Sequence, residues 1–150
     1  MFIDLKQLTT KAWNKILSED TYNQIVNENP NKDTNKTAYS YIYKKQNEAL
    51  QEAWNNFKAN PVKKLEKEFK QFKSENSFWL DDYALYMEVK ADHDAKCWSE
   101  WEDDIRLRKP EALEAYREKL AQDIVFYQYL QYKFSRQWEQ LKNYANEKGI

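Results

Sequence analysis

The chain has 150 residues, of which 33% are charged and 41% hydrophobic, and its 24 basic residues nearly balance 25 acidic ones. This length predicts one domain with a hydrophobic core of its own. The single glycine excludes glycine-rich phosphate loops, dinucleotide-binding folds and the tight hairpins of all-β folds, while one cysteine and one histidine exclude disulfide scaffolds and structural zinc sites.

The net charge of -1 argues against nucleic acid as a partner, because there is no basic excess to neutralise phosphates. The sequence does not open with a basic segment followed by a long apolar run, and it has no stretch of about 18 apolar residues. We therefore expect a soluble, cytoplasmic protein that does not enter a membrane and needs no metal or other cofactor.

Residues 1–36 are predicted to form an N-terminal segment with one short helix and a polar loop. The helix begins at its cap, Thr9 or Thr10, and places apolar side chains on one face. Residues 27–36 contain no apolar member and include a proline, which predicts the loop. The apolar face of the short helix comprises Trp13, Ile16 and Leu17.

Residues 37–150 are predicted to form an all-α helical subdomain. Apolar residues recur at three- and four-residue steps through residues 37–59, which predicts a helix that ends before Asn60 and Pro61. A second helix follows, and Ser77 is predicted to cap a third helix that is apolar over a wide arc. The predicted apolar face of the first of these helices comprises Tyr39, Ile42, Tyr43, Ala49, Leu50, Ala53, Trp54 and Phe57.

Residues 91–109 break the helical pattern and are predicted to form an irregular connection with one short helical turn. Helical spacing then runs from Pro110 to Gly149, which predicts one long C-terminal helix of about 38 residues and roughly 57 Å. Its middle, residues 124–134, is apolar nearly all round, so we expect it to be covered on more than one side. Gly149 is placed to form a left-handed C-cap of this helix. The sequence ends one residue later, at Ile150, and two explanations fit about equally well: a cut through a longer chain, or an apolar contact of Ile150 that closes the cap.

Neighbouring acidic residues are not expected to form a catalytic pair. Retaining glycosidases place two carboxyl groups about 5 to 5.5 Å apart, whereas Asp81 and Asp82 diverge by about 100° on a helix. We expect Asp82 to be a half-buried carboxylate that is paired with an arginine. The candidate arginines are Arg106, Arg108 and Arg117.

The lone histidine and the lone cysteine are both assigned structural roles. His93 lies between two aspartates, an arrangement that can orient a general base, but no nucleophile with matched spacing accompanies it. A loop histidine is the favoured interpretation. Cys97 is interpreted as a small buried hydrophobic residue, because no histidine or basic helix terminus lies beside it. We therefore assign no catalytic and no metal-binding residue.

Aromatic residues make up 16% of the chain. Flat tryptophan and tyrosine faces pack against sugar rings, so carbohydrate binding is one interpretation. Most of the aromatic residues recur at core spacing, which favours a structural role for them. The aromatic residues at the start of an element or in an irregular stretch, where they can face a ligand, are Tyr39, Tyr41, Trp98 and Trp101.

Blocks of sequence in the second half of the chain follow one another in a distinctive order. They are residues 77–87 (SFWLDDYALYM), 98–101 (WSEW), 104–108 (DIRLR), 110–113 (PEAL), 126–132 (FYQYLQY), 137–138 (QW) and 144–150 (YANEKGI). Together these blocks resemble the 4-α-glucanotransferases, also called amylomaltases or disproportionating enzymes.

The resemblance is strong over residues 69–150, weaker over 37–68 and poor over 6–36, and it includes the Phe-Ile-Asp-Leu step at residues 2–5. The sequence departs from the family at three positions. The family usually has aspartate where this chain has Ala38, and proline where it has Cys97 and Glu102.

The resemblance implies a larger enzyme on a (β/α)8 barrel that moves α-1,4-glucan segments between maltooligosaccharides by a retaining two-step mechanism. It also implies that this chain covers only the helical insertion of that enzyme. The family's catalytic carboxylates lie on barrel strands that follow the matched segment, so no catalytic residue maps onto this sequence. By the same resemblance, Tyr39 is a substrate-binding residue that contacts glucan.

We therefore interpret the chain as the helical insertion subdomain of such an enzyme, inactive alone and forming a wall of the substrate groove. A fragment of this kind is expected to self-associate through apolar surface around residues 124–134. One alternative is a standalone helical protein-interaction module, which would be a well-folded monomer or symmetric oligomer. Another is a carbohydrate-binding module whose affinity falls when Tyr39 is replaced by alanine.

Overall fold

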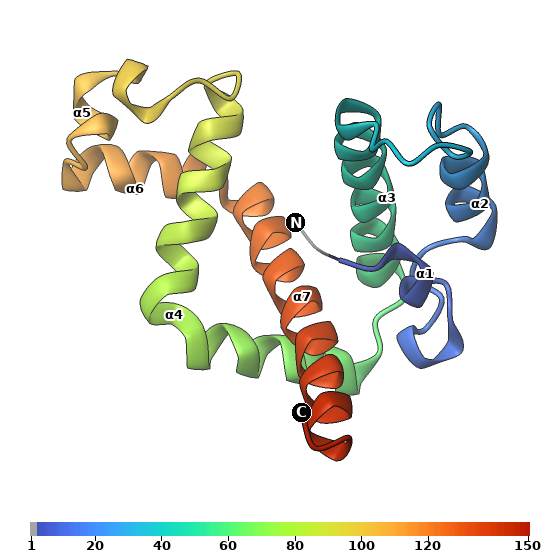
Figure 1. Cartoon of the computed structure of the whole chain (residues 1–150). Helices are drawn as coiled ribbons and strands as arrows, with labels where there is room; N and C mark the ends of the chain where they lie inside the picture. Colours follow the sequence, from blue (N-terminus) through green and yellow to red (C-terminus); the bar gives the residue numbers. More distant parts are fainter. Residues whose placement is uncertain (1–2) are drawn as a thin grey trace. The chain divides into compact units, whose positions relative to one another are not determined.

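The computed structural model describes residues 3–150, and that part of the chain is helical with no β-strand in it. The prediction of an all-α chain is confirmed for these residues. Phe2, part of the step at residues 2–5, lies outside them. The α-helices (Figure 1) are α1 Leu5–Leu8, α2 Glu19–Asn27, α3 Tyr39–Ala59, α4 Lys63–Asp92, α5 Asp103–Arg106, α6 Pro110–Lys119 and α7 Ala121–Glu147, with short 3-10 helices η1 Lys11–Trp13 and η2 Trp98–Glu100.

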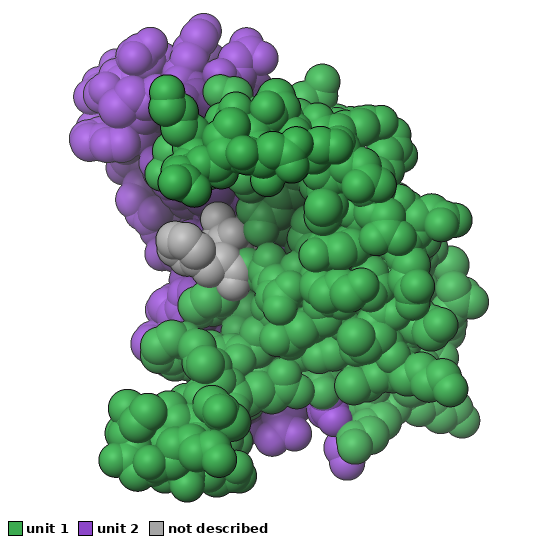
Figure 2. Space-filling view, turned by 45° about the vertical axis from the view of Figure 1, so that its right-hand side comes forward, with its two compact units in different colours: residues 1–66, 134–150 green, residues 67–133 purple. Residues whose placement is uncertain are grey.

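The chain divides into two compact units (Figure 2). Unit 1 comprises residues 1–66 together with 134–150, and unit 2 comprises residues 67–133. Helices α4 and α7 each contribute residues to both units. The boundary expected at residue 36 stays a prediction. None of the helices in residues 3–150 is both long enough and apolar enough to cross a membrane.

The helix predicted to begin at Thr9 or Thr10 is present only as the three-residue 3-10 helix η1, with Thr10 at its N-cap position but without a side-chain cap hydrogen bond. Both threonine hydroxyls donate to carbonyl groups of the preceding helix α1, and η1 then ends in a left-handed turn at Asn14 and Lys15. A helix cannot continue through two left-handed residues. The apolar side chains predicted for this helix are nevertheless buried, and they are Trp13, Ile16 and Leu17.

Helix α2 was not predicted, although its start has a clear chemical cause. Ser18 is the N-cap, and its hydroxyl accepts from the Thr21 amide at 3.0 Å. Glu52 of α3 accepts from the Ser18 amide at 3.0 Å and from the Thr21 hydroxyl at 2.6 Å. A carboxylate is therefore held at the positive end of α2, which fixes α2 against α3. The loop predicted for residues 27–36 is confirmed from residue 28 onward.

Helix α3 confirms the prediction for residues 37–59 but buries only the C-terminal part of its apolar face. Tyr39 and Tyr43 in the first turns are exposed, and Ile42 is partly exposed. The buried residues of α3 are Ala49, Leu50, Ala53, Trp54 and Phe57. The helix ends next to Asn60 and Pro61, as predicted, because proline cannot donate the amide hydrogen bond that a continuing helix needs.

Helix α4 is continuous where two helices were predicted, so Ser77 is not an N-cap. The Ser77 hydroxyl instead donates to the Ser74 carbonyl at 3.2 Å, and the side-chain amide of Asn76 donates to the Phe72 carbonyl at 2.8 Å. Hydrogen bonds from a side chain to a backbone carbonyl of the preceding turn compete with the backbone hydrogen bonds of the helix, and they can bend it. Figure 1 shows α4 changing direction part way along its length.

The prediction of a single C-terminal helix from residue 110 to residue 149 is also wrong, because the chain forms two helices there. Leu120 has φ -107° and ψ 15°, which ends α6 before α7 begins. No glycine or proline marks this break. Leu120 is buried in a cluster with Leu85, Val89, Trp101 and Ile105, and side chains of α6 and α7 pack against the same cluster. Tertiary packing therefore sets the break, and α4 is the longest helix in the described chain.

The middle of α7 confirms the prediction that it is covered on several sides. Every residue from 124 to 134 is buried or half-buried. The exposed apolar surface expected around this stretch is therefore not present, although self-association itself stays a prediction.

The C-terminal end of α7 contains the predicted left-handed cap. Gly149 has φ +76°, its amide donates to the Asn146 carbonyl, and the Ile150 amide donates to the Ala145 carbonyl, both at 3.0 Å. Ile150 is 88% exposed. The alternative that an apolar contact of Ile150 closes the cap is therefore wrong.

Candidate functional site

The four aromatic candidates from the sequence fall into two groups. Tyr39 is the first residue of α3 in unit 1, and the residue is 79% exposed. Tyr41 has a structural bond, because its hydroxyl donates to the Ile25 carbonyl at 2.9 Å. Trp98 and Trp101 belong to unit 2, where both line a cavity. The structure therefore brings the two tryptophans together, while Tyr39 belongs to a different unit.

The start of α3, which presents Tyr39, lacks a side-chain cap. Ala38 occupies the N-cap position and cannot accept a hydrogen bond through its methyl group. Replacing Ala38 by aspartate, the residue usual in the family that the sequence resembles, is expected to raise the free energy of unfolding by about 1 kcal/mol. Urea denaturation measures this difference. Thr37→Asp, one residue outside the cap, is the matched control, and an equal gain from both variants would contradict a capping effect.

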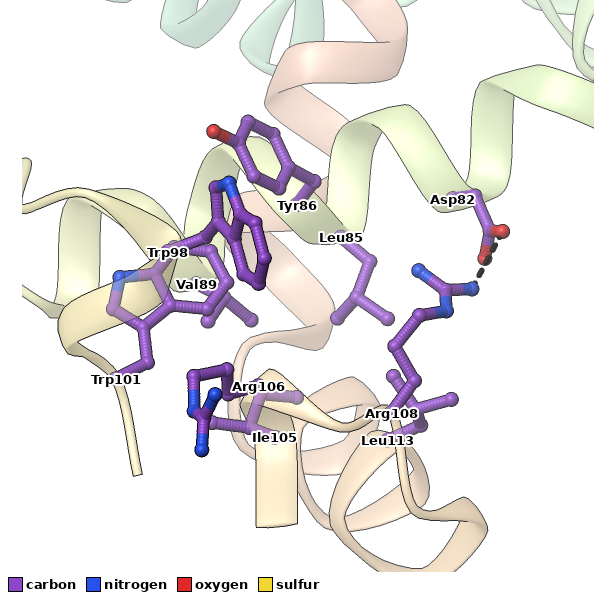
Figure 3. A pocket seen from close by; sticks show the side chains of 10 residues that line it. All are labelled: Asp82, Leu85, Tyr86, Val89, Trp98, Trp101, Ile105, Arg106, Arg108 and Leu113. Carbon is purple, nitrogen blue, oxygen red and sulfur yellow. Dashed lines mark hydrogen bonds and ion pairs between the residues drawn. The ribbon is translucent and has the colours of Figure 1, made fainter. Parts of the chain in front are cut away.

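Unit 2 contains a cavity of about 270 Å³ between α4, η2, α5 and α6. Its side chains converge from a helix, two short turns and a second helix (Figure 3). Most of the lining is apolar or aromatic. The lining residues are Asp82, Leu85, Tyr86, Val89, Trp98, Trp101, Ile105, Arg106, Arg108 and Leu113.

Asp82 forms an ion pair at one side of the cavity, as the sequence predicted. The Arg108 guanidinium donates to its carboxylate at 2.7 Å (Figure 3). Arg117 lies 3.9 Å from the other carboxylate oxygen. The side chain of Asp82 is 55% exposed, so the expectation that it is half-buried is wrong. Asp81 instead accepts from Gln128 of α7 at 2.8 Å. The two neighbouring carboxylates therefore face different partners.

Arg108 adopts a backbone conformation that usually belongs to glycine. Its φ is +56°, its amide donates to the Ile105 carbonyl at 3.0 Å, and the Lys109 amide donates to the Asp104 carbonyl at 2.9 Å. These two bonds form the C-terminal cap motif of α5, in which a left-handed residue follows the helix. A large residue in this conformation costs free energy that glycine would avoid. The sequence carried no signal for this turn, because helix caps of this kind are predicted from glycine.

Trp101 forms one wall of the cavity and is fixed by its neighbours. Its ring centroid lies 5.5 Å from that of Tyr86 and 5.1 Å from that of His93. Only 8% of Trp101 is exposed. Trp98, by contrast, is 52% exposed and is open to a ligand.

His93 follows α4 directly, which agrees with a loop histidine, and it makes two strong hydrogen bonds. Nδ1 donates to the Val89 carbonyl and Nε2 to the Glu102 carboxylate, both at 2.7 Å. Two acceptors require both ring nitrogens to carry protons. Burial opposes the charged ring, but the hydrogen bonds to Glu102 and to the Val89 carbonyl, together with the charges of Glu102 and Asp92, outweigh it and raise the pKa of His93. The sequence drew attention to the flanking aspartates and missed Glu102, nine residues away.

The ion pair of His93 and Glu102 predicts that the stability of the protein depends on pH. Glu102→Gln is expected to destabilise the protein near pH 6, where His93 is charged, and to have little effect near pH 9. The sign follows from the raised pKa of His93: its contribution is complete below about pH 6.5 and is lost as pH rises through the folded-state value. Unfolding free energies of wild type and variant, compared at each pH, measure the effect.

The pH experiment must account for a second titrating group, Glu88, and needs a control substitution. Burial and nearby Asp123 raise the pKa of Glu88 to about 7, but Glu88 titrates in wild type and variant alike, so the comparison at each pH removes its contribution. Glu100→Gln, an exposed position on η2, is the matched control. A Glu102→Gln effect that is the same at both pH values would contradict the ion pair.

Cys97 corrects another prediction, because it is exposed and not a buried hydrophobic residue. The Ser99 hydroxyl donates to its sulfur at 3.2 Å, and this hydrogen bond lowers the pKa of the thiol. Within residues 3–150 there is no group of three or more His, Cys, Asp or Glu side chains that could hold a metal ion.

The residues that line the cavity suit ligand binding better than glycosidic bond cleavage. Among its described lining residues, Asp82 is the only carboxylate, and it is engaged by Arg108. General acid and base catalysis of glycoside cleavage requires two carboxyl groups that flank the bond. The lining instead offers flat apolar faces and a few hydrogen-bonding groups, which is the composition of a ligand pocket.

Comparison with known proteins gives consistent matches. A family model described as 4-alpha-glucanotransferase (Glyco_hydro_77) matches residues 1–150. The chain is 36% identical over 151 residues to the 4-alpha-glucanotransferase of Clostridium butyricum, covering 99% of this chain and 28% of that protein. It is 39% identical over 108 residues to the 4-alpha-glucanotransferase of Synechocystis sp., covering 72% of this chain and 21% of that protein.

A solved structure extends the match to three dimensions. The amylomaltase from Streptococcus agalactiae in complex with acarbose superposes with a TM-score of 0.80 at 30% identity, covering 99% of this chain and 28% of that one. The chain thus spans about a quarter of the length of its relatives. These matches confirm the family resemblance predicted from the sequence blocks.

Proposed function

The chain belongs to the 4-alpha-glucanotransferase family, and from this membership we propose that it acts as the helical part of an enzyme that transfers α-1,4-glucan segments between maltooligosaccharides. The observation that carries the proposal is the family match over residues 1–150. The whole enzyme would use a retaining mechanism on a (β/α)8 barrel, and a cytoplasmic location stays a prediction. A standalone interaction module is not favoured, because the family match leaves no part of the chain unexplained.

In this proposal the helical chain positions substrate and does not break bonds. The catalytic carboxylates would belong to barrel strands outside residues 1–150, while the helices form a wall of the substrate groove. The acarbose complex of the S. agalactiae amylomaltase supports an oligosaccharide ligand for the whole enzyme. Tyr39 is proposed to contact glucan, which is supported by its exposed position at the start of α3.

Incubation of the purified 150-residue chain with maltotriose tests the proposal that the helical chain positions substrate without breaking bonds. We expect no glucose release, because a helical wall without a catalytic carboxylate pair cannot cleave a glycosidic bond. The full-length C. butyricum relative, assayed alongside, should release glucose and serves as the positive control. Glucose release by the isolated chain that survives repurification would contradict the proposal.

A further inference from the structure

We propose that the unit 2 cavity lined by Trp98, Trp101 and the Asp82–Arg108 pair binds one glucosyl unit of a maltooligosaccharide. The choice of an α-glucan as ligand rests on the proposed function, whereas the site itself rests on the geometry of unit 2.

The size of the cavity suits a single sugar ring. Its volume of about 270 Å³ lies just below the range of about 300 to 1,000 Å³ typical of pockets for drug-sized molecules. A pyranose ring has two flat faces of C–H groups and an edge of hydroxyls. Such a ligand needs an apolar, planar contact together with donors and acceptors at the rim.

The side chains provide both kinds of contact. Trp98 projects over the cavity from η2, and Leu85 and Val89 of α4 form its floor (Figure 3). Trp98 is 52% exposed, so a sugar ring that covers its face removes apolar surface from water. Trp101 is already fixed between Tyr86 and His93, so this wall is formed before a ligand arrives. A preformed wall lowers the entropic cost of binding.

The charges at the rim favour a neutral ligand. The Asp82 carboxylate is neutralised by Arg108 at 2.7 Å, and Arg106 is paired with Asp103 at 2.6 Å. No charge among these groups is left to attract a phosphate or a carboxylate. Arg108 has five N–H donors and Asp82 up to four acceptor sites, so the pair can still bind several hydroxyl groups. A polyhydroxylated neutral molecule matches this combination.

The backbone at Arg108 agrees with a role for its side chain. Glycine would relieve the left-handed turn at φ +56°, and the helix cap needs no side chain there. The position nevertheless holds an arginine, whose guanidinium reaches the edge of the cavity. Arg108→Gly should therefore preserve the turn while it removes the hydroxyl-binding group.

Titration of the 150-residue chain with maltotriose, followed through the indole N–H signals in NMR spectra, tests the site. We expect the Trp98 signal to shift in a saturable manner. Trp98→Ala should raise Kd about tenfold or more, since it removes the stacking face. Arg108→Gly should raise Kd several-fold with the helical content unchanged. Trp138→Ala, at a similarly exposed tryptophan of unit 1, is the matched control and should leave Kd within about twofold.

Three results would overturn the proposal. They are the absence of saturable maltotriose binding, binding that Tyr39→Ala abolishes while Trp98→Ala leaves it unchanged, and equal binding of an apolar peptide or of a β-1,4-linked oligosaccharide. None of these results bears on glucan transfer by the whole enzyme, which is measured by glucose release. Failure of the site and failure of the proposed function are therefore distinguishable.

Discussion

Replacing Tyr129 by alanine is expected to lower the free energy of unfolding by about 3 to 5 kcal/mol. Tyr129 is fully buried in unit 2, and its ring meets Phe69 edge to face at a centroid distance of 6.0 Å. The Lys133 ammonium lies 5.0 Å from the same ring centroid and is itself buried. The substitution thus creates a cavity and also removes a cation–π contact from a charge that water does not reach. Urea denaturation measures the loss.

Two further variants show whether the ring is responsible. Tyr129→Phe keeps the ring and should retain most of the stability. Tyr144→Ala removes a 60% exposed tyrosine from the same helix and should change stability by no more than about 0.5 kcal/mol. If Tyr129→Ala cost no more than Tyr144→Ala, the buried aromatic core of unit 2 would be contradicted.

Replacing Gln137 by leucine is expected to cost about 2 to 3 kcal/mol. Gln137 of α7 is 8% exposed, and its amide makes a pair of hydrogen bonds to the backbone of Asp4. Its Oε1 accepts from the Asp4 amide at 2.8 Å, and its Nε2 donates to the Asp4 carbonyl at 3.0 Å. Leucine has a similar volume but leaves both backbone groups without this partner. The variant should therefore loosen the N-terminal segment within unit 1.

Hydrogen exchange separates this effect from general destabilisation. The Asp4 amide should exchange faster in Gln137→Leu before the rest of unit 1 opens. Gln140→Leu, three residues along α7 and exposed, is the matched control and should leave that amide protected. Unchanged protection of the Asp4 amide in Gln137→Leu would show that the two bonds do not hold the segment.

Local sequence signals predicted the parts of the fold that depend on local chemistry. Pro61 cannot continue a helix, and α3 ends beside it. Gly149 readily adopts a left-handed conformation, and it caps α7. The helical spacing of residues 124–134 correctly predicted a covered helix segment. In each case the cause lies within a few residues of the effect.

The errors arose where contacts that a local pattern does not reveal decide the outcome, either with the neighbouring helical turn or with distant residues. Ser77 is a good N-cap in isolation, but its hydroxyl bonds to the preceding turn within a continuous helix. Leu120 favours helix, yet the chain breaks there because Leu120 is buried in the cluster with Trp101 and Ile105. Gln137 and Asp4 are separated by 133 positions, so no local pattern could pair them.

The site was predictable in its members but not in its arrangement. Sequence reasoning selected Trp98 and Trp101 for their irregular surroundings and expected an arginine partner for Asp82. It could not show that these residues surround one cavity together with Leu85 and Val89, because the turn at Arg108 carries no glycine to reveal it. Family membership, by contrast, followed from the order of whole sequence blocks.

Exchange of the matched segment of the S. agalactiae amylomaltase for residues 1–150 tests most directly whether this chain is the helical part of a 4-alpha-glucanotransferase. The chimera is predicted to release glucose from maltotriose at a rate within about tenfold of the parent enzyme. A chimera with the corresponding C. butyricum segment is the matched control. A folded chimera that releases no glucose, while the control chimera does, would contradict the assignment.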